Sequence, residues 1–221
     1  MRPGLEPRGR SRCRVLALTA WLVAALHHAA APGAPLDTLL AVVDARTVAA
    51  SDVALARGLG VLGFAPSTGP IARSEVERYV DVLLILEEAG GIGITVEPAE
   101  IDRAWAAAAA RAGGEPALDR WLQTHAIDRA WARRLVEAGL RRERFFDERF
   151  AAFVFVDEEA IARALGPGPH DETARERARD RLTREAGERA QAEWLDAARQ
   201  RATIRILVSN GASIPPPFPP P

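Results

Sequence analysis

The sequence GLGVLG, residues 58–63, has the G-x-G-x-x-G spacing with which dinucleotide-binding proteins bring backbone amides close to a pyrophosphate. That chemistry needs a strand that ends at the first glycine and a helix that begins at the last one. Here a helix-start signal, Ser51-Asp52, lies upstream, and the following FAPSTGP, residues 64–70, cannot continue a helix. The glycines therefore predict a loosened helix end rather than a nucleotide site.

Histidines, carboxylates and hydroxyls are the other candidates for catalysis or metal binding. His125 and His170 are far apart in the sequence, and neither has a cluster of further ligands nearby. Asp157, Glu158 and Glu159 resemble paired carboxylates, but at a helix start they are explained by capping and by the helix dipole. No serine stands in a G-x-S-x-G frame. We therefore expect no catalytic residue, no metal and no cofactor.

Aromatic side chains beside arginine are candidates for binding rather than catalysis. Most aromatics of the chain fall at helical spacing, where core packing is the default. In RRERFFDERF, Phe146 and Phe150 are four residues apart on one helix edge, and Phe145 and Arg149 lie on the next. Exposed aromatic surface beside arginine suits the extended apolar segments of an unfolded client protein. We predict client binding by these four residues.

The N-terminal region differs in composition from the rest of the chain. Five arginines precede the apolar run VLALTAWLVAAL, residues 15–26, and small residues follow it. This order predicts a secretory signal over residues 1–33, cut between about 30 and 34, and hence export to the periplasm. The run is short for a membrane span. The alternative is an uncleaved signal that anchors the protein in the inner membrane.

Charge and cysteine content restrict the partners of the mature chain. Loss of the signal removes five of 29 basic residues and one of 30 acidic ones, which leaves a formal charge of −5. A mildly acidic chain without a basic cluster is poorly suited to nucleic acid. The single cysteine, Cys13, lies within the signal, so we expect neither disulfides nor thiol chemistry. No small-molecule substrate is indicated.

Helical patterns fill most of the chain between residues 51 and 201. The expected helices begin near Ser51-Asp52, Ser74, Thr95–Pro98, Glu115, Ile127, Asp157 and Glu172. Two short segments alternate like strands instead: LAVVDARTVA near the start and ATIRIL near the end. An isolated hairpin is marginal in water, so we expect residues 202–207 to pair with it. The predicted fold is mainly α, with a small sheet that joins both ends of the chain.

The order of these elements resembles a known family, the SurA-type periplasmic chaperones. The opening AVVDARTVAASDV, the helices VDVLLILEEA and RRLVEAGLRRERFFDERF, and the close WLDAARQRATIRIL are similar to the corresponding family motifs. So are ITVEPAEIDRAWA and VFVDEEAIARAL, each at the start of a helix. The resemblance implies a chaperone core over residues 36–207, built from an N-terminal part (36–156) and C-terminal helices with a strand (157–207). Residues 208–221 are rich in proline, and we expect them to be disordered.

One departure from the family concerns catalysis. Relatives usually carry one or two parvulin-type prolyl isomerase domains after the helix that starts at Asp157. Only about forty residues separate Val156 from Trp194 here, and they read as helices. The resemblance therefore implies a chaperone that binds unfolded or partly folded envelope proteins, and the missing isomerase domain argues against an enzyme. The alternatives are an adaptor for one folded envelope partner, and a peptidyl-prolyl isomerase by family label only.

Overall fold

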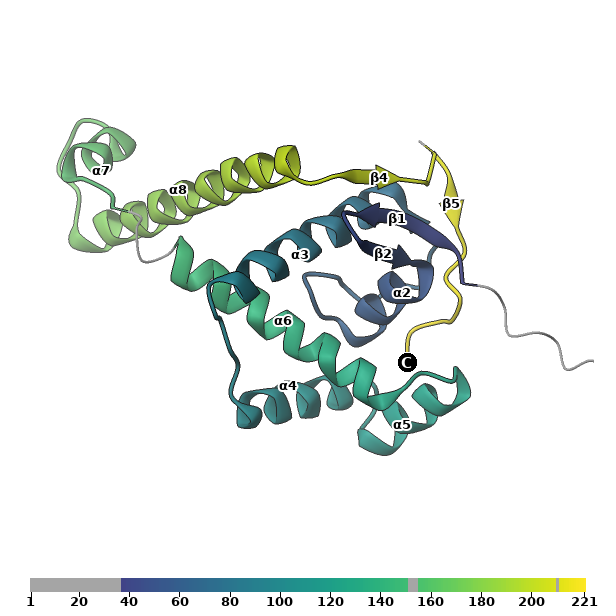
Figure 1. Cartoon of the computed structure of the whole chain (residues 1–221). Helices are drawn as coiled ribbons and strands as arrows, with labels where there is room; N and C mark the ends of the chain where they lie inside the picture. Colours follow the sequence, from purple (N-terminus) through teal and green to yellow (C-terminus); the bar gives the residue numbers. More distant parts are fainter. Residues whose placement is uncertain (1–36, 151–154, 210) are drawn as a thin grey trace, which may run out of the picture. The chain divides into compact units, whose positions relative to one another are not determined.

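The N-terminal hairpin and a C-terminal strand form one antiparallel sheet in the computed structural model, which describes residues 37–150, 155–209 and 211–221. Strand β1 (Leu39–Val43) lies between β2 (Arg46–Ala49) and β4 (Ile204–Ile206) (Figure 1). The register places Ala41, Val42 and Val43 opposite Ile206, Arg205 and Ile204. The predicted pairing of the hairpin with the terminal strand is confirmed, and so is the mainly α fold with a small sheet.

The turn of the hairpin also binds the C-terminal segment. Asp44 has a φ of 51°, in the left-handed region that aspartate tolerates better than most residues. Its backbone N–H donates to the Thr203 carbonyl at 2.9 Å, and the Thr203 N–H donates to the Asp44 carboxylate at 2.8 Å. The reciprocal pair of bonds fixes the register at which β4 enters the sheet.

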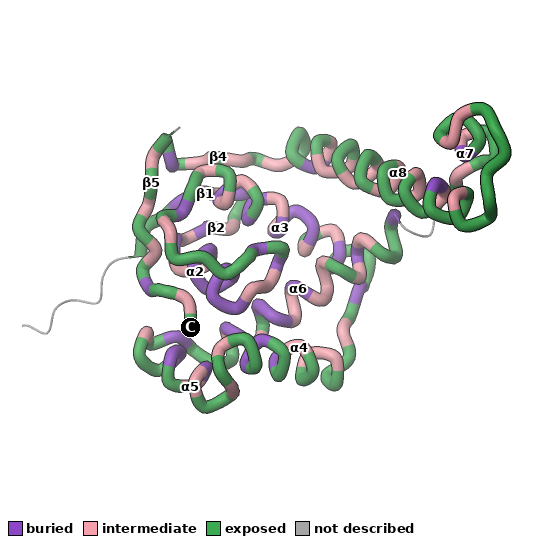
Figure 2. The backbone as a smooth tube through the Cα atoms, turned by 180° about the vertical axis from the view of Figure 1, so that it is seen from behind, coloured by how far each residue is buried: buried purple, intermediate pink, exposed green. Residues whose placement is uncertain are grey.

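The buried centre of the fold consists of α2 (Ala50–Leu59), which appears largely in purple in Figure 2, and of one face of α3 (Arg73–Gly91), where purple alternates with pink and green. Helix α3 contacts the sheet, α6 and α8, as its nearly all-round apolar sequence predicts. Both helices begin one or two residues before the expected caps. Asp52 and Glu75 therefore lie inside the first turn, and their carboxylates accept from the backbone N–H of Ala49 and Ala72 at 2.8 and 2.9 Å.

The remaining helices follow the expected order, and two of them, α6 and α8, pack against α3. They are α4 (Pro98–Arg111), α5 (Glu115–Thr124), α6 (Arg129–Arg149), α7 (Glu158–Leu165) and α8 (Glu172–Arg201). Side-chain caps from Asp128, Asp157 and Asp171 begin α6, α7 and α8. Helix α8 leads directly into β4, and most of its surface is exposed (Figures 1 and 2). Its thin apolar stripe agrees with packing along a single edge.

The prediction of a disordered C-terminal tail is wrong for the described residues of 208–221. Strand β5 (Ser213–Ile214) pairs antiparallel with β3 (Ile71–Ala72), and Val208 and Phe218 are buried. Composition suggested disorder because prolines cannot join a sheet and bury little surface. Scattered apolar residues between them nevertheless find partners on the helical body, and a few such anchors order the segment.

The predicted signal peptide, residues 1–33, lies outside the described residues. Asp37–Pro221 form one compact unit by their internal contacts. Among the helices that the structure describes, none is long and apolar enough to cross a membrane.

Candidate functional site

An aromatic cluster joins α3, α6 and α8. The Phe145 ring is 5.0 Å from that of Trp194 on α8, and the Phe150 ring is 6.3 Å from it, measured between centroids. Phe145 is 0% exposed and Phe150 is 7% exposed. The prediction that these two phenylalanines present an exposed surface to clients is therefore wrong. They pack α6 against α8 instead, together with Ile85 of α3.

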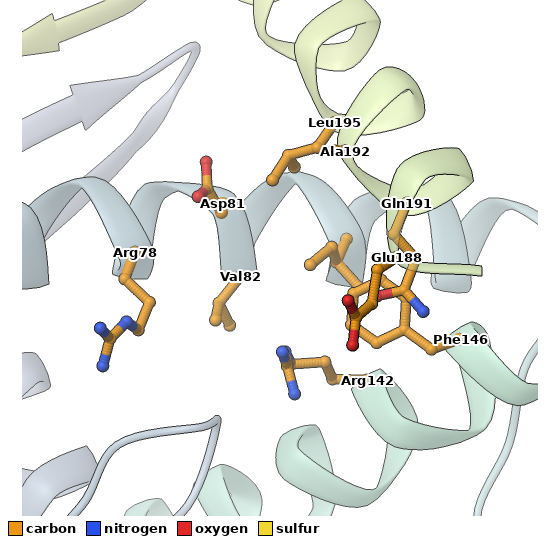
Figure 3. A pocket seen from close by; sticks show the side chains of 10 residues that line it. Arg78, Asp81, Val82, Arg142, Phe146, Glu188, Gln191, Ala192 and Leu195 are labelled. Atoms are coloured by element: carbon orange, nitrogen blue, oxygen red, sulfur yellow. The ribbon is translucent and has the colours of Figure 1, made fainter. Parts of the chain in front are cut away.

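Phe146, the third predicted residue, is more open than either, although the edge of Phe150 also lines the second of the cavities described next. It is half-buried and lines two neighbouring cavities of about 320 and 330 Å³, which also share Glu188 and Gln191 of α8. We call these two cavities the α6–α8 groove. The first cavity extends to α3, where Val82 and Ile85 add apolar surface (Figure 3). The groove thus exposes one face of a phenylalanine between helices that are far apart in the sequence.

An arginine lies over this phenylalanine. The guanidinium carbon of Arg142 is 4.8 Å from the centre of the Phe146 ring, within the range of a cation–π contact. Burial lowers the pKa of Arg142 from its usual value, and the neighbouring charge of Arg78 lowers it further, while Glu143 opposes both effects. An arginine stays protonated regardless. The partly buried guanidinium of Arg142 therefore presents a positive charge to the first cavity, where an incoming anionic group would be attracted.

Asp81 and Glu188 also line the first cavity, and neither forms an ion pair with Arg142 in the described part of the chain. Asp81 is bound in a bidentate ion pair by Arg199, with two N–O distances of 2.7 Å. Burial raises the pKa of Asp81, and the bonds from Arg199 oppose that rise. Glu188 is exposed on α8. The Nε atom of Arg142 is buried and has no hydrogen-bond partner among the described residues.

Sequence reasoning missed part of this site and misplaced another part. Arg149 is exposed at the last residue of α6, and the arginine that stacks on Phe146 is Arg142. A signal for it was present, because Arg142 precedes Phe146 by four residues and so lies on the same helix edge. The wall formed by Glu188 and Gln191 had no such signal, since it depends on where α8 packs.

The glycine motif has a structural role. Gly60 ends α2 in the left-handed conformation with a φ of 62°, so the predicted helix end is confirmed. An added Cβ at Gly58 would lie 3.0 Å from Trp121 Cη2, which shows that this glycine allows close packing of α5. His125 contacts aromatic rings, and His170 Nε2 lies 3.1 Å from the Gly166 carbonyl oxygen.

Neither histidine contributes to a metal-binding cluster in the part of the chain that the structure describes, where no group of three or more candidate ligands occurs. The arrangement of the α6–α8 groove suits non-covalent binding of an apolar segment that carries a negative charge. No protein-family model matches the sequence, and no curated protein matches it.

Proposed function

We propose that the protein is a chaperone-like factor that binds unfolded or partly folded envelope proteins in the α6–α8 groove, without nucleotide or metal. The observation that supports this most is the half-buried Phe146 under Arg142, between two open cavities of about 320 and 330 Å³. Cavities of this size hold a few side chains rather than a whole folded surface. The ligand expected from this chemistry is an extended segment with an aromatic residue near an aspartate or glutamate.

Binding of this kind is weak and reversible. A single aromatic contact and a single cation–π pair contribute about 1 kcal/mol each, which gives little affinity for one isolated segment. An unfolded chain offers many such segments, and folding removes them from solution. The client's own folding therefore drives release, and no energy source is required. A periplasmic location is part of the proposal and depends on the composition of residues 1–33.

The test is suppression of aggregation of several unrelated denatured proteins at near-stoichiometric ratios. The wild type should suppress all of them, and Phe146→Ala should lose most of this effect. Phe155→Ala is the matched control, because Phe155 is 88% exposed and does not line either cavity of the groove. Equal loss in both variants would mean that any exposed phenylalanine suffices and would contradict a groove-specific site.

The aggregation assay separates the first alternative, and a peptide assay separates the second. An adaptor for one folded envelope partner would protect none of the unrelated proteins. A peptidyl-prolyl isomerase would accelerate isomerisation of a proline-containing tetrapeptide, whereas the proposed chaperone should leave that rate at background.

A further inference from the structure

The proline-rich C-terminal segment is held by the pairing of β5 with β3 and, beyond β5, by one aromatic anchor. Phe218 is 8% exposed, and its ring centre lies 5.4 Å from that of Trp121 and 5.5 Å from that of His125. The indole N–H of Trp121 donates to the Pro219 carbonyl at 2.8 Å. Figure 1 shows this yellow segment passing from β5 to its end beside α5.

The surface beneath the segment is shaped for close approach. Trp121 lies against Gly58 of α2, and Pro221 Cδ would be 3.3 Å from a Cβ added at that glycine. Any larger residue at position 58 would meet both the indole and the proline ring. We call the surface formed by Gly58, Trp121 and His125 the α2–α5 groove.

The contacts match the chemistry by which proteins recognise proline-rich peptides. Prolines lack an N–H, so such a segment can only accept hydrogen bonds, and an indole N–H is a suitable donor. Because its φ angles are restricted, a proline-rich segment loses less conformational entropy on binding than an ordinary chain does. Aromatic-lined grooves use both properties. Four of the six prolines of the tail (Pro215, Pro217, Pro219 and Pro221) are exposed, so Phe218 and one carbonyl carry the contact of the part beyond β5.

We propose that the α2–α5 groove is a binding site for a proline-rich segment of another protein that contains an aromatic residue, and that the protein's own tail is its displaceable resident ligand. This site is separate from the α6–α8 groove, because the two are formed by different helices. A tethered ligand has an effective concentration on the order of millimolar. It therefore occupies a site of micromolar affinity most of the time and lowers the apparent affinity for an external peptide.

The experiment uses the full chain and the labelled peptide GASIPPPFPPP, which has the sequence of residues 211–221. Fluorescence anisotropy should show roughly 10- to 100-fold tighter binding to Phe218→Ala than to the wild type, because loss of the aromatic anchor frees the part of the tail beyond β5. The control peptide GASIPPPAPPP should not bind. Adding Trp121→Phe to the Phe218→Ala variant removes the indole donor and should weaken binding by about 2- to 10-fold.

A second variant covers the case in which Phe218→Ala fails to fold. The double variant P217G/P219G keeps the aromatic anchor but loosens the tail, since glycine raises the entropy of the released state. It too should bind the peptide more tightly than the wild type. Unchanged affinity in every folded variant would overturn the proposal and leave the tail a purely structural strap. A concentration-dependent dimer in light scattering would also overturn it, because the tail of a second copy would then occupy the groove.

Discussion

Replacing the two adjacent phenylalanines of α6 separates a packing role from a binding role. Phe145 is fully buried against Trp194, so Phe145→Ala removes a large side chain from a closed cluster. Such truncations cost about 3–5 kcal/mol of unfolding free energy. At about 2–4 °C per kcal/mol for a chain of this size, the melting temperature should fall by roughly 6–20 °C.

Phe146→Ala is the matched variant, with the same chemical change one residue further along. Phe146 is only half-buried, so its truncation should cost about 1 kcal/mol, in proportion to the apolar area it covers. Its effect should appear in client protection instead. Urea titration gives both unfolding free energies, and aggregation assays well below the lower melting temperature give the binding effect for each variant.

Either of two results would contradict the packing role of Phe145 and the binding role of Phe146. The first is a Phe145→Ala variant whose unfolding free energy falls by less than about 1 kcal/mol, since removal of a buried ring from a closed cluster costs more than that. The second is a Phe146→Ala variant that is as unstable as Phe145→Ala, because any loss of client protection would then reflect unfolding.

Three further predictions concern the sheet, the charges and pH. Deleting residues 201–221 removes β4 and should lower the melting temperature sharply. Deleting only residues 211–221 keeps the three-stranded sheet and should lower the melting temperature less. Equal losses would contradict the closure of the fold by β4. Arg142→Gln should weaken binding of a peptide with an aromatic residue beside aspartate by up to about tenfold. Binding of an uncharged analogue of the peptide should change little, and fluorescence titration measures both affinities. The backbone N–H of Glu97, followed by the Arg144 guanidinium, holds the pKa of Glu100 below its usual value of 4.5. The ionised Glu100 carboxylate therefore stabilises the fold above pH 4.5, and this stabilisation is lost as the pH falls through the lower pKa of the folded state. Melting temperatures from pH 7 to pH 3 should fall less steeply in E100Q than in the wild type, and identical slopes would contradict this linkage.

Local patterns predicted much of this fold. The hairpin and β4 follow from residues that alternate between two faces, and the terminal helix extends over the expected Glu172–Arg201. The order of Val208 and Phe218 could not be predicted this way, because it depends on partners more than 80 residues away, such as Trp121. Sequence composition reports only how much apolar surface a segment has, and not whether a groove exists to receive it.

The candidate site was harder to predict than the fold. Phe145 and Phe146 of α6 point in directions about 100° apart, and Phe150 follows Phe146 by four residues, so the sequence alone does not tell which of the three rings the neighbouring helix covers. Helix α8 covers two of them and leaves the third half-open. Its thin stripe of alanines fixes that it packs on one edge but not which partner it packs against.

The central position of β1 also determines when the protein can finish folding. Until Ile204–Ile206 have been synthesised, one edge of β1 has no neighbour, and its free amides and carbonyls can pair with any passing strand. The contact between Val43 and Ile204 spans nearly the whole described chain, so its closure is entropically expensive and slow. The chain would therefore stay incomplete, and prone to association, until Ile204–Ile206 pair with β1.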